Sequence, residues 1–89
     1  MKSFYALSKS ASESNALSGK VKELIALAIA VSTRCDGCIA FHTQAALKAG
    51  ASKEEIVEML GVTVFMGGGP SLMYATHVME AIEQFSQES

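Results

Sequence analysis

Residues 21–31 read VKELIALAIAV, and this stretch decides the class of the fold. All but two of its residues are apolar. A run of this length that is rich in Leu and Ala predicts an α-helix buried on most of its sides. The β-branched residues Ile25, Ile29 and Val31 leave a buried strand as the alternative.

Three more helices are predicted after this run. Helical spacing of apolar residues resumes over residues 36–48, and Gly50 marks the C-terminal stop. Ser52 and Glu55 match a capping box, which predicts that a helix starts at Ser52. Residues 67–70 read GGGP, which ends that helix and suits the first turn of a last helix over about 71–85. The predicted core positions on these helices are Ile39, Ala46 and Leu47; Ile56, Met59, Leu60 and Thr63 or Val64; and Leu72, Ala75, Val78, Met79 and Ile82.

The whole chain is expected to form one domain. Its 89 residues leave no room for a second core of ordinary size, so we predict a single domain over 1–89 with its core over about 18–86. Residues 1–15 are Ser-rich, with Phe4, Tyr5 and Leu7 as apolar anchors, and are predicted to form a short helix or an arm. The predicted fold class is therefore all-α, with about five helices and a central helical hairpin.

Composition excludes several classes of function. The net charge of -2 and the scattered basic residues argue against nucleic-acid binding, which needs clustered Lys and Arg. We find no apolar run of about 18 residues and no signal-peptide pattern, so no membrane association is expected and a cytoplasmic location is predicted. An apolar content of 49% is hard to bury in so short a chain, which predicts a homo-oligomer. Met59, Met66, Met73 and Met79 are interpreted as core or subunit-interface residues.

The pair Cys35 and Cys38 begins the helix predicted over 36–48 and is the main candidate for chemistry. Their spacing closes too small a loop to stabilise a fold, so a catalytic or metal-binding role is expected. A helix start stabilises a thiolate, and the second sulfur can close a disulfide with the first. His42 lies one helical turn after Cys38, which places a base beside a thiol. Asp36 is expected to cap this helix.

Other interpretations of these residues stay open. Cys35, Cys38 and His42 with a fourth ligand such as His77 would suit a zinc site. A redox-sensing oligomer without turnover is a second alternative, and inert packing of the cysteines is a third. Tyr74 and His77 would line a pocket at the thiols if the last helix packs over Cys38.

Glu23, followed twelve residues later by Cys35-x-x-Cys38-x-x-x-His42, resembles the pattern of the AhpD-like (alkylhydroperoxidase) branch of the carboxymuconolactone decarboxylase family. The resemblance covers about residues 20–85 and includes the GGGP break. It implies an all-α AhpD-like domain that assembles into trimers or hexamers. The implied activity is that of an antioxidant oxidoreductase, a thiol-dependent peroxidase or disulfide reductase that needs no metal, flavin or nucleotide cofactor.

The resemblance also implies a role for each site residue. Cys38 would be the attacking thiol, Cys35 its resolving partner, His42 the proton carrier and Glu23 the acid/base that completes a proton relay. The implied partners are a hydroperoxide or disulfide substrate and a dithiol reductant, either a lipoyl-bearing or a thioredoxin-like protein. Gly37 stands where some members carry a second histidine, so that residue's step is not transferred. The decarboxylase branch lacks the cysteine pair, so lactone decarboxylation is not expected.

Spacing alone does not bring Glu23 to the thiols. Counted as continuous helix, Glu23 lies about 18 Å before Cys35 and His42 about 10 Å beyond it. A simple antiparallel hairpin would therefore set Glu23 nearer Leu47. A crossing angle, a bridging water or a neighbouring subunit would be needed to join Glu23 to the site.

Overall fold

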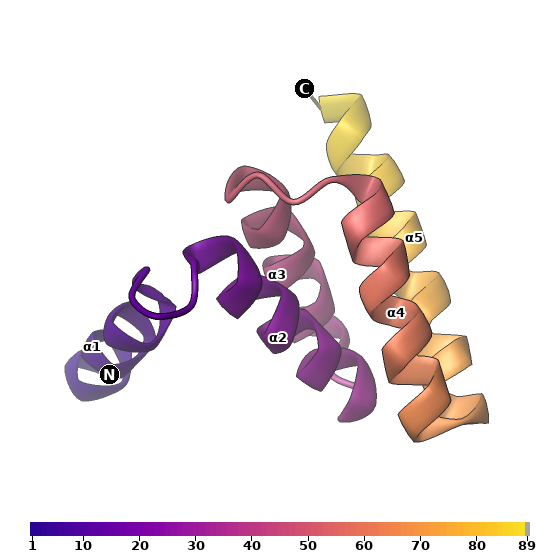
Figure 1. The fold of residues 1–89 in the computed structure, drawn as a ribbon, viewed down its shortest axis with the longest axis horizontal. Helices are drawn as coiled ribbons and strands as arrows, with labels where there is room; N and C mark the ends of the chain where they lie inside the picture. Colours follow the sequence, from indigo (N-terminus) through magenta and orange to yellow (C-terminus); the bar gives the residue numbers. More distant parts are fainter. Residues whose placement is uncertain (89) are drawn as a thin grey trace.

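A computed structural model of the chain describes residues 1–88, and this part contains five α-helices and no strand (Figure 1). The all-α prediction is confirmed, and the strand alternative for residues 21–31 is wrong. The prediction for the last helix is three residues too short at its C-terminal end, and Ser89 lies outside the described residues. The helices are α1 (Lys2–Ser12), α2 (Gly19–Ser32), α3 (Asp36–Lys48), α4 (Lys53–Gly67) and α5 (Gly69–Glu88).

Helices α2 and α3 form the central hairpin, and α4 and α5 form a second antiparallel pair beside it (Figure 1). Helix α1 packs on α2, on the side of the hairpin away from the α4–α5 pair, and none of its residues is buried. The core therefore comes from the other four helices and one loop residue. Its members are Leu27, Ala30, Val31, Ile39, Ala46, Ala51, Ile56, Leu60, Ala75, Val78 and Ile82.

Two predictions of burial are wrong. Helix α2 is not buried on most sides, because Ile25 is 44% exposed and Ile29 57% exposed in the single chain. Only one face of α2 packs on α3, α4 and α5, while α1 covers the opposite face in part. Leu72, placed in the buried stripe of α5 by its spacing, is 55% exposed because the neighbouring Ser71, which is 4% exposed, takes the inward-facing position in the first turn of α5. Met66 and Met73 are exposed as well, which leaves the subunit-interface alternative of their prediction.

Local hydrogen bonds explain where the helices begin. Ser18 caps α2 by accepting a hydrogen bond from the backbone N–H of Val21. At α4 both halves of the predicted capping box are present: Ser52 Oγ accepts from Glu55 N–H at 3.0 Å, and Glu55 Oε1 accepts from Ser52 N–H at 2.9 Å. The side chain of Glu55 also pairs with Lys20 of α2 at 2.9 Å, which ties the two helices together.

Helices α2 and α3 end in the same backbone motif. Cys35 N–H donates to Ala30 O and Arg34 N–H donates to Val31 O, and the matching pair at the end of α3 involves Ala51 and Gly50. Gly50 has a φ of 98°, as the prediction of a C-terminal stop requires. Arg34 occupies the equivalent position with a φ of 58°, where a side chain is unfavourable. The turn that leads into Cys35 therefore has a strained residue.

Gly68 separates α4 from α5 as the GGGP pattern predicted. Its φ of 73° and ψ of -150° lie in a region that essentially only glycine adopts. None of the helices within residues 1–88 is both long and apolar enough to cross a lipid bilayer.

Candidate redox site

The turn between α2 and α3 places both cysteines at the start of α3. Cys35 is the N-cap residue, and its Sγ accepts a hydrogen bond from the backbone N–H of Cys38 at 3.3 Å. The prediction that Asp36 caps this helix is wrong, because Asp36 is already its first helical residue. The two sulfurs form a disulfide, with their Cα atoms 5.2 Å apart. The structure therefore holds the pair in its oxidised form.

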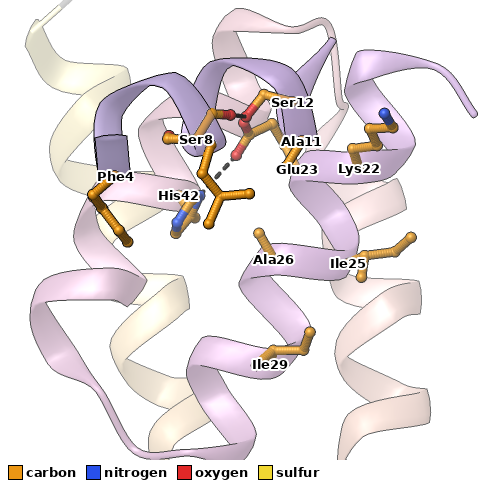
Figure 2. A pocket seen from close by; sticks show the side chains of 11 residues that line it. Phe4, Ser8, Ala11, Ser12, Lys22, Glu23, Ile25, Ala26, Ile29 and His42 are labelled. Carbon is orange, nitrogen blue, oxygen red and sulfur yellow. Dashed lines mark hydrogen bonds and ion pairs between the residues drawn. The ribbon is translucent and has the colours of Figure 1, made fainter. Parts of the chain in front are cut away.

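Glu23 and His42 meet directly within one chain. Glu23 Oε1 lies 2.8 Å from His42 Nδ1, and the dashed line between these two residues in Figure 2 marks this contact. The expectation that a hairpin would set Glu23 nearer Leu47 is wrong because residues 33–35 form a turn and add little helical rise. Counted from the observed helix ends, Glu23 lies about 13 Å before the turn and His42 about 9 Å after it. The two side chains span the remaining offset.

The hydrogen bond fixes which nitrogen of His42 is free. An ionised carboxylate only accepts hydrogen bonds, so His42 Nδ1 carries the hydrogen that Glu23 receives. In neutral His42 the other nitrogen, Nε2, is then unprotonated and can take a proton. The Glu23 and His42 side chains are only 15% and 28% exposed, so the pair is held in one orientation by its surroundings. The arrangement can accept a proton at one defined atom.

Cys38 and His42 line the same small pocket. Its volume is about 270 Å³, and its other lining residues come from α2 and from the turn after it: Ala26, Ile29, Ala30 and Thr33. A larger groove of about 400 Å³ shares Ala26, Ile29 and His42 with this pocket and runs between α1 and α2 (Figure 2). Phe4 and Leu7 of α1 and Ile25 of α2 make the groove mostly apolar. A ligand that reaches Cys38 from this groove passes along an apolar surface.

Tyr74 and His77 do not line the pocket that contains Cys38 and His42. His77 Nδ1 lies 2.5 Å from Asp36 Oδ1, and the ring of Tyr74 stands edge-on to His77 with centroids 4.9 Å apart. This contact joins α5 to the first turn of α3. The contact could not be predicted from the sequence, because Asp36 and His77 are 41 residues apart and share no motif.

The residues of the zinc alternative are not gathered at one point. His42 pairs with Glu23 and His77 pairs with Asp36, while Cys35 and Cys38 bond to each other. Within residues 1–88, no group of three or more His, Cys, Asp or Glu side chains is arranged to hold a metal ion. The arrangement that the structure does present is a disulfide flanked by two histidine–carboxylate pairs.

The chain is similar to proteins of one family. A family model described as the carboxymuconolactone decarboxylase family matches residues 1–81. An uncharacterized protein of Cupriavidus necator is 43% identical over 79 residues, which cover 89% of this chain and 70% of that protein. The uncharacterized protein 4 of the cox locus of Paracoccus denitrificans is 35% identical over 81 residues, covering 91% of this chain and 73% of that protein.

Solved structures show the same fold. The apo form of a carboxymuconolactone decarboxylase family protein from Legionella pneumophila superposes with a TM-score of 0.94 at 52% identity, over 97% of this chain and 77% of that one. A protein of the same family from Thermotoga maritima superposes with a TM-score of 0.91 at 30% identity, over 98% of this chain and 90% of that one. The Thermotoga protein is described as a candidate for a role in the antioxidative response.

Proposed function

Because the chain belongs to the carboxymuconolactone decarboxylase family, we propose that it is a thiol-dependent reductase of hydroperoxides or disulfides. One observation carries the proposal: Cys38 lines a pocket with His42, whose ring is oriented by Glu23, and Cys35 is already bonded to Cys38. These are the parts that an activated thiol and its resolving partner need. The antioxidative role suggested for the Thermotoga protein points in the same direction.

The proposed reaction begins with the reduced pair. His42 Nε2 takes the proton of the Cys38 thiol, and the thiolate attacks the distal oxygen of a hydroperoxide, ROOH. The O–O bond breaks as the S–O bond forms, so the sulfur is oxidised to a sulfenic acid and the peroxide is reduced. The imidazolium returns its proton to the leaving oxygen, which departs as the alcohol, ROH.

The second cysteine then closes the cycle. The Cys35 thiol attacks the Cys38 sulfenic acid, the disulfide forms, and water leaves. An external dithiol reduces this disulfide by thiol–disulfide exchange and is itself oxidised to a disulfide. We propose a lipoyl-bearing or thioredoxin-like protein as the donor. The same Cys38 thiolate would attack a sulfur atom when the substrate is a disulfide.

The choice of Cys38 as the attacking thiol has structural support. Cys38 is exposed and lines the pocket with His42, whereas Cys35 is partly buried and does not line that pocket. The pocket and the adjoining groove are mostly apolar. We therefore expect substrates with an apolar body. Lactone decarboxylation, which the family name suggests, is not proposed, because it makes no use of a cysteine pair.

The proposed activity is tested by steady-state turnover. The purified protein is mixed with cumene hydroperoxide and dihydrolipoamide, and loss of peroxide is followed with the parent chain, Cys35→Ser and Cys38→Ser. The proposal expects multiple turnovers with the parent chain only. Normal folding with no turnover under dihydrolipoamide, thioredoxin or dithiothreitol would leave a redox sensor without turnover as the better interpretation.

We also propose that the chain self-associates. Phe65 at the end of α4 and Met73 early in α5 are 83% and 64% exposed, and Phe4 of α1 is 67% exposed. Such side chains are costly to leave in water. A trimer or hexamer would cover part of them. Light scattering on the parent chain and on Phe65→Ser tests this: the parent should be oligomeric, and a monomeric parent would contradict the proposal.

A cytoplasmic location is proposed as well. The proposed cycle starts from the reduced thiols, and the cytoplasm keeps cysteine pairs of this kind reduced. Fractionation of cells that express the tagged protein tests the location.

A further inference from the structure

The disulfide has a second histidine–carboxylate pair beside it that the proposed reaction does not use. Asp36 follows Cys35 in the chain and is the first residue of α3, and His77 reaches it from α5. The Asp36 and His77 side chains are 65% and 41% exposed, so the contact lies at the surface. The Glu23–His42 pair, by contrast, is mostly buried and lines the groove.

The negative charge of Asp36 disfavours the thiolate form of the neighbouring Cys35. Reduction of the disulfide gives two thiols, and the start of a helix favours their ionised form. A carboxylate on the next residue disfavours a thiolate, because the two charges have the same sign. By itself, Asp36 would therefore destabilise the reduced pair relative to the disulfide.

His77 offsets this charge. Asp36 accepts a hydrogen bond from His77 Nδ1 in either protonation state of the ring, because an ionised carboxylate has no hydrogen to donate. When the ring is protonated, the pair is also an ion pair. The ring is held in place by the edge-on contact with Tyr74. Loss of His77 would leave the carboxylate beside Cys35 uncompensated.

We propose that His77 is a positioning residue that acts through Asp36 to raise the reduction potential of the Cys35–Cys38 pair. The inference rests on the proposed redox cycle of this pair. Arg34, directly before Cys35, adds a positive charge on the same turn, and the variants below leave it in place.

The test is an equilibrium with dithiothreitol at pH 7, in which two electrons and two protons pass to the disulfide and the reagent closes to its cyclic disulfide. Asp36→Asn should raise the equilibrium constant for reduction about twofold, and His77→Ala should lower it about twofold. Together the two changes make up the roughly fourfold effect expected for one full charge in the first turn of an exposed helix. Each change corresponds to about 9 mV for a two-electron couple. The double variant, which carries both Asp36→Asn and His77→Ala, should have the same equilibrium constant as Asp36→Asn alone. Once the Asp36 carboxylate is gone, His77 has no charge to compensate.

A purely structural contact would behave differently. It would make both single variants shift the equilibrium in the same direction or leave it unchanged, and either result would overturn the inference. Glu83→Gln is the matched control: it removes one exposed carboxylate from α5 without removing either partner of the Asp36–His77 contact, and it should leave the equilibrium constant within a factor of about 1.3, because exposed charges contribute little. Far-UV circular dichroism checks that each variant is folded.

The dithiothreitol equilibrium and the peroxide turnover assay together separate this inference from the proposed function. A parent chain whose disulfide is reduced reversibly but which turns over no peroxide would overturn the proposed function. The inference about His77 would then still be decided by the shifts of the equilibrium constant in Asp36→Asn and His77→Ala. A parent chain whose disulfide resists excess dithiothreitol would overturn both.

Discussion

Replacing Glu23 by Gln should slow the reaction of Cys38 with hydroperoxide. The Glu23–His42 hydrogen bond of 2.8 Å is charge-assisted, and such bonds contribute about 1.5–3 kcal/mol, against about 1 kcal/mol for a neutral bond. Gln can still accept from Nδ1 but carries no charge, so about 1–1.5 kcal/mol of stabilisation of the protonated ring is lost. Since about 1.4 kcal/mol corresponds to a factor of ten, the rate should fall about five- to tenfold.

The assay isolates the first step. In a Cys35→Ser background no disulfide can form, so the rate of sulfenic acid formation with cumene hydroperoxide reports on Cys38 and His42 alone. Glu55→Gln is the matched control, because Glu55 also forms an ion pair, with Lys20 at 2.9 Å, but does not line either pocket beside His42. A folded Glu23→Gln variant that reacts as fast as the control variant would refute the proton relay.

Three other substitutions test the account of the fold. Gly68→Ala should lower the free energy of unfolding by about 1–3 kcal/mol in urea titration, because its φ of 73° and ψ of -150° suit only glycine; an unchanged midpoint would contradict this. Arg34→Gly should raise the melting temperature by relieving up to about 1 kcal/mol of backbone strain at its φ of 58°, and a lower value would show that the side chain contributes more than its conformation costs. The Ser52 backbone N–H, together with Lys20, lowers the pKa of Glu55 below its ordinary value, so this group stabilises the fold above about pH 4.5 and the contribution is lost as pH falls further. Glu55→Gln should therefore be less stable than the parent at pH 7 and show a smaller loss of stability in acid denaturation; equal acid sensitivity would exclude this role.

The helix boundaries could be predicted where short-range chemistry sets them. The capping box at Ser52 and the stop at Gly50 need only neighbouring residues, and both are present in the structure. Burial could not be predicted as well. Ile29 has the spacing of a core residue, yet its exposure depends on how much of α2 is covered by α1, which the sequence does not encode in any local pattern.

At the candidate site, too, only the local contacts could be predicted from the sequence. The i to i+4 spacing of Cys38 and His42 follows from the helix alone, and both residues line one pocket. The contact between Glu23 and His42 depends on residues 33–35 being a turn, which an unbroken count of helical rise overlooks. Asp36 and His77 meet only because α5 packs on α3, so no spacing in the sequence indicates their contact.

The proposed cycle makes Cys38 the peroxide-reactive thiol and Cys35 its resolving partner. Intact-mass analysis of the reduced protein after one equivalent of hydroperoxide tests these roles, with Cys35→Ser and Cys38→Ser treated in parallel with dimedone. We expect loss of two hydrogens in the parent chain, their return with dihydrolipoamide, and a dimedone adduct in Cys35→Ser alone. An adduct in Cys38→Ser alone would reverse the roles of the two cysteines, and thiols that stay unreacted in all three proteins would contradict the proposed cycle altogether.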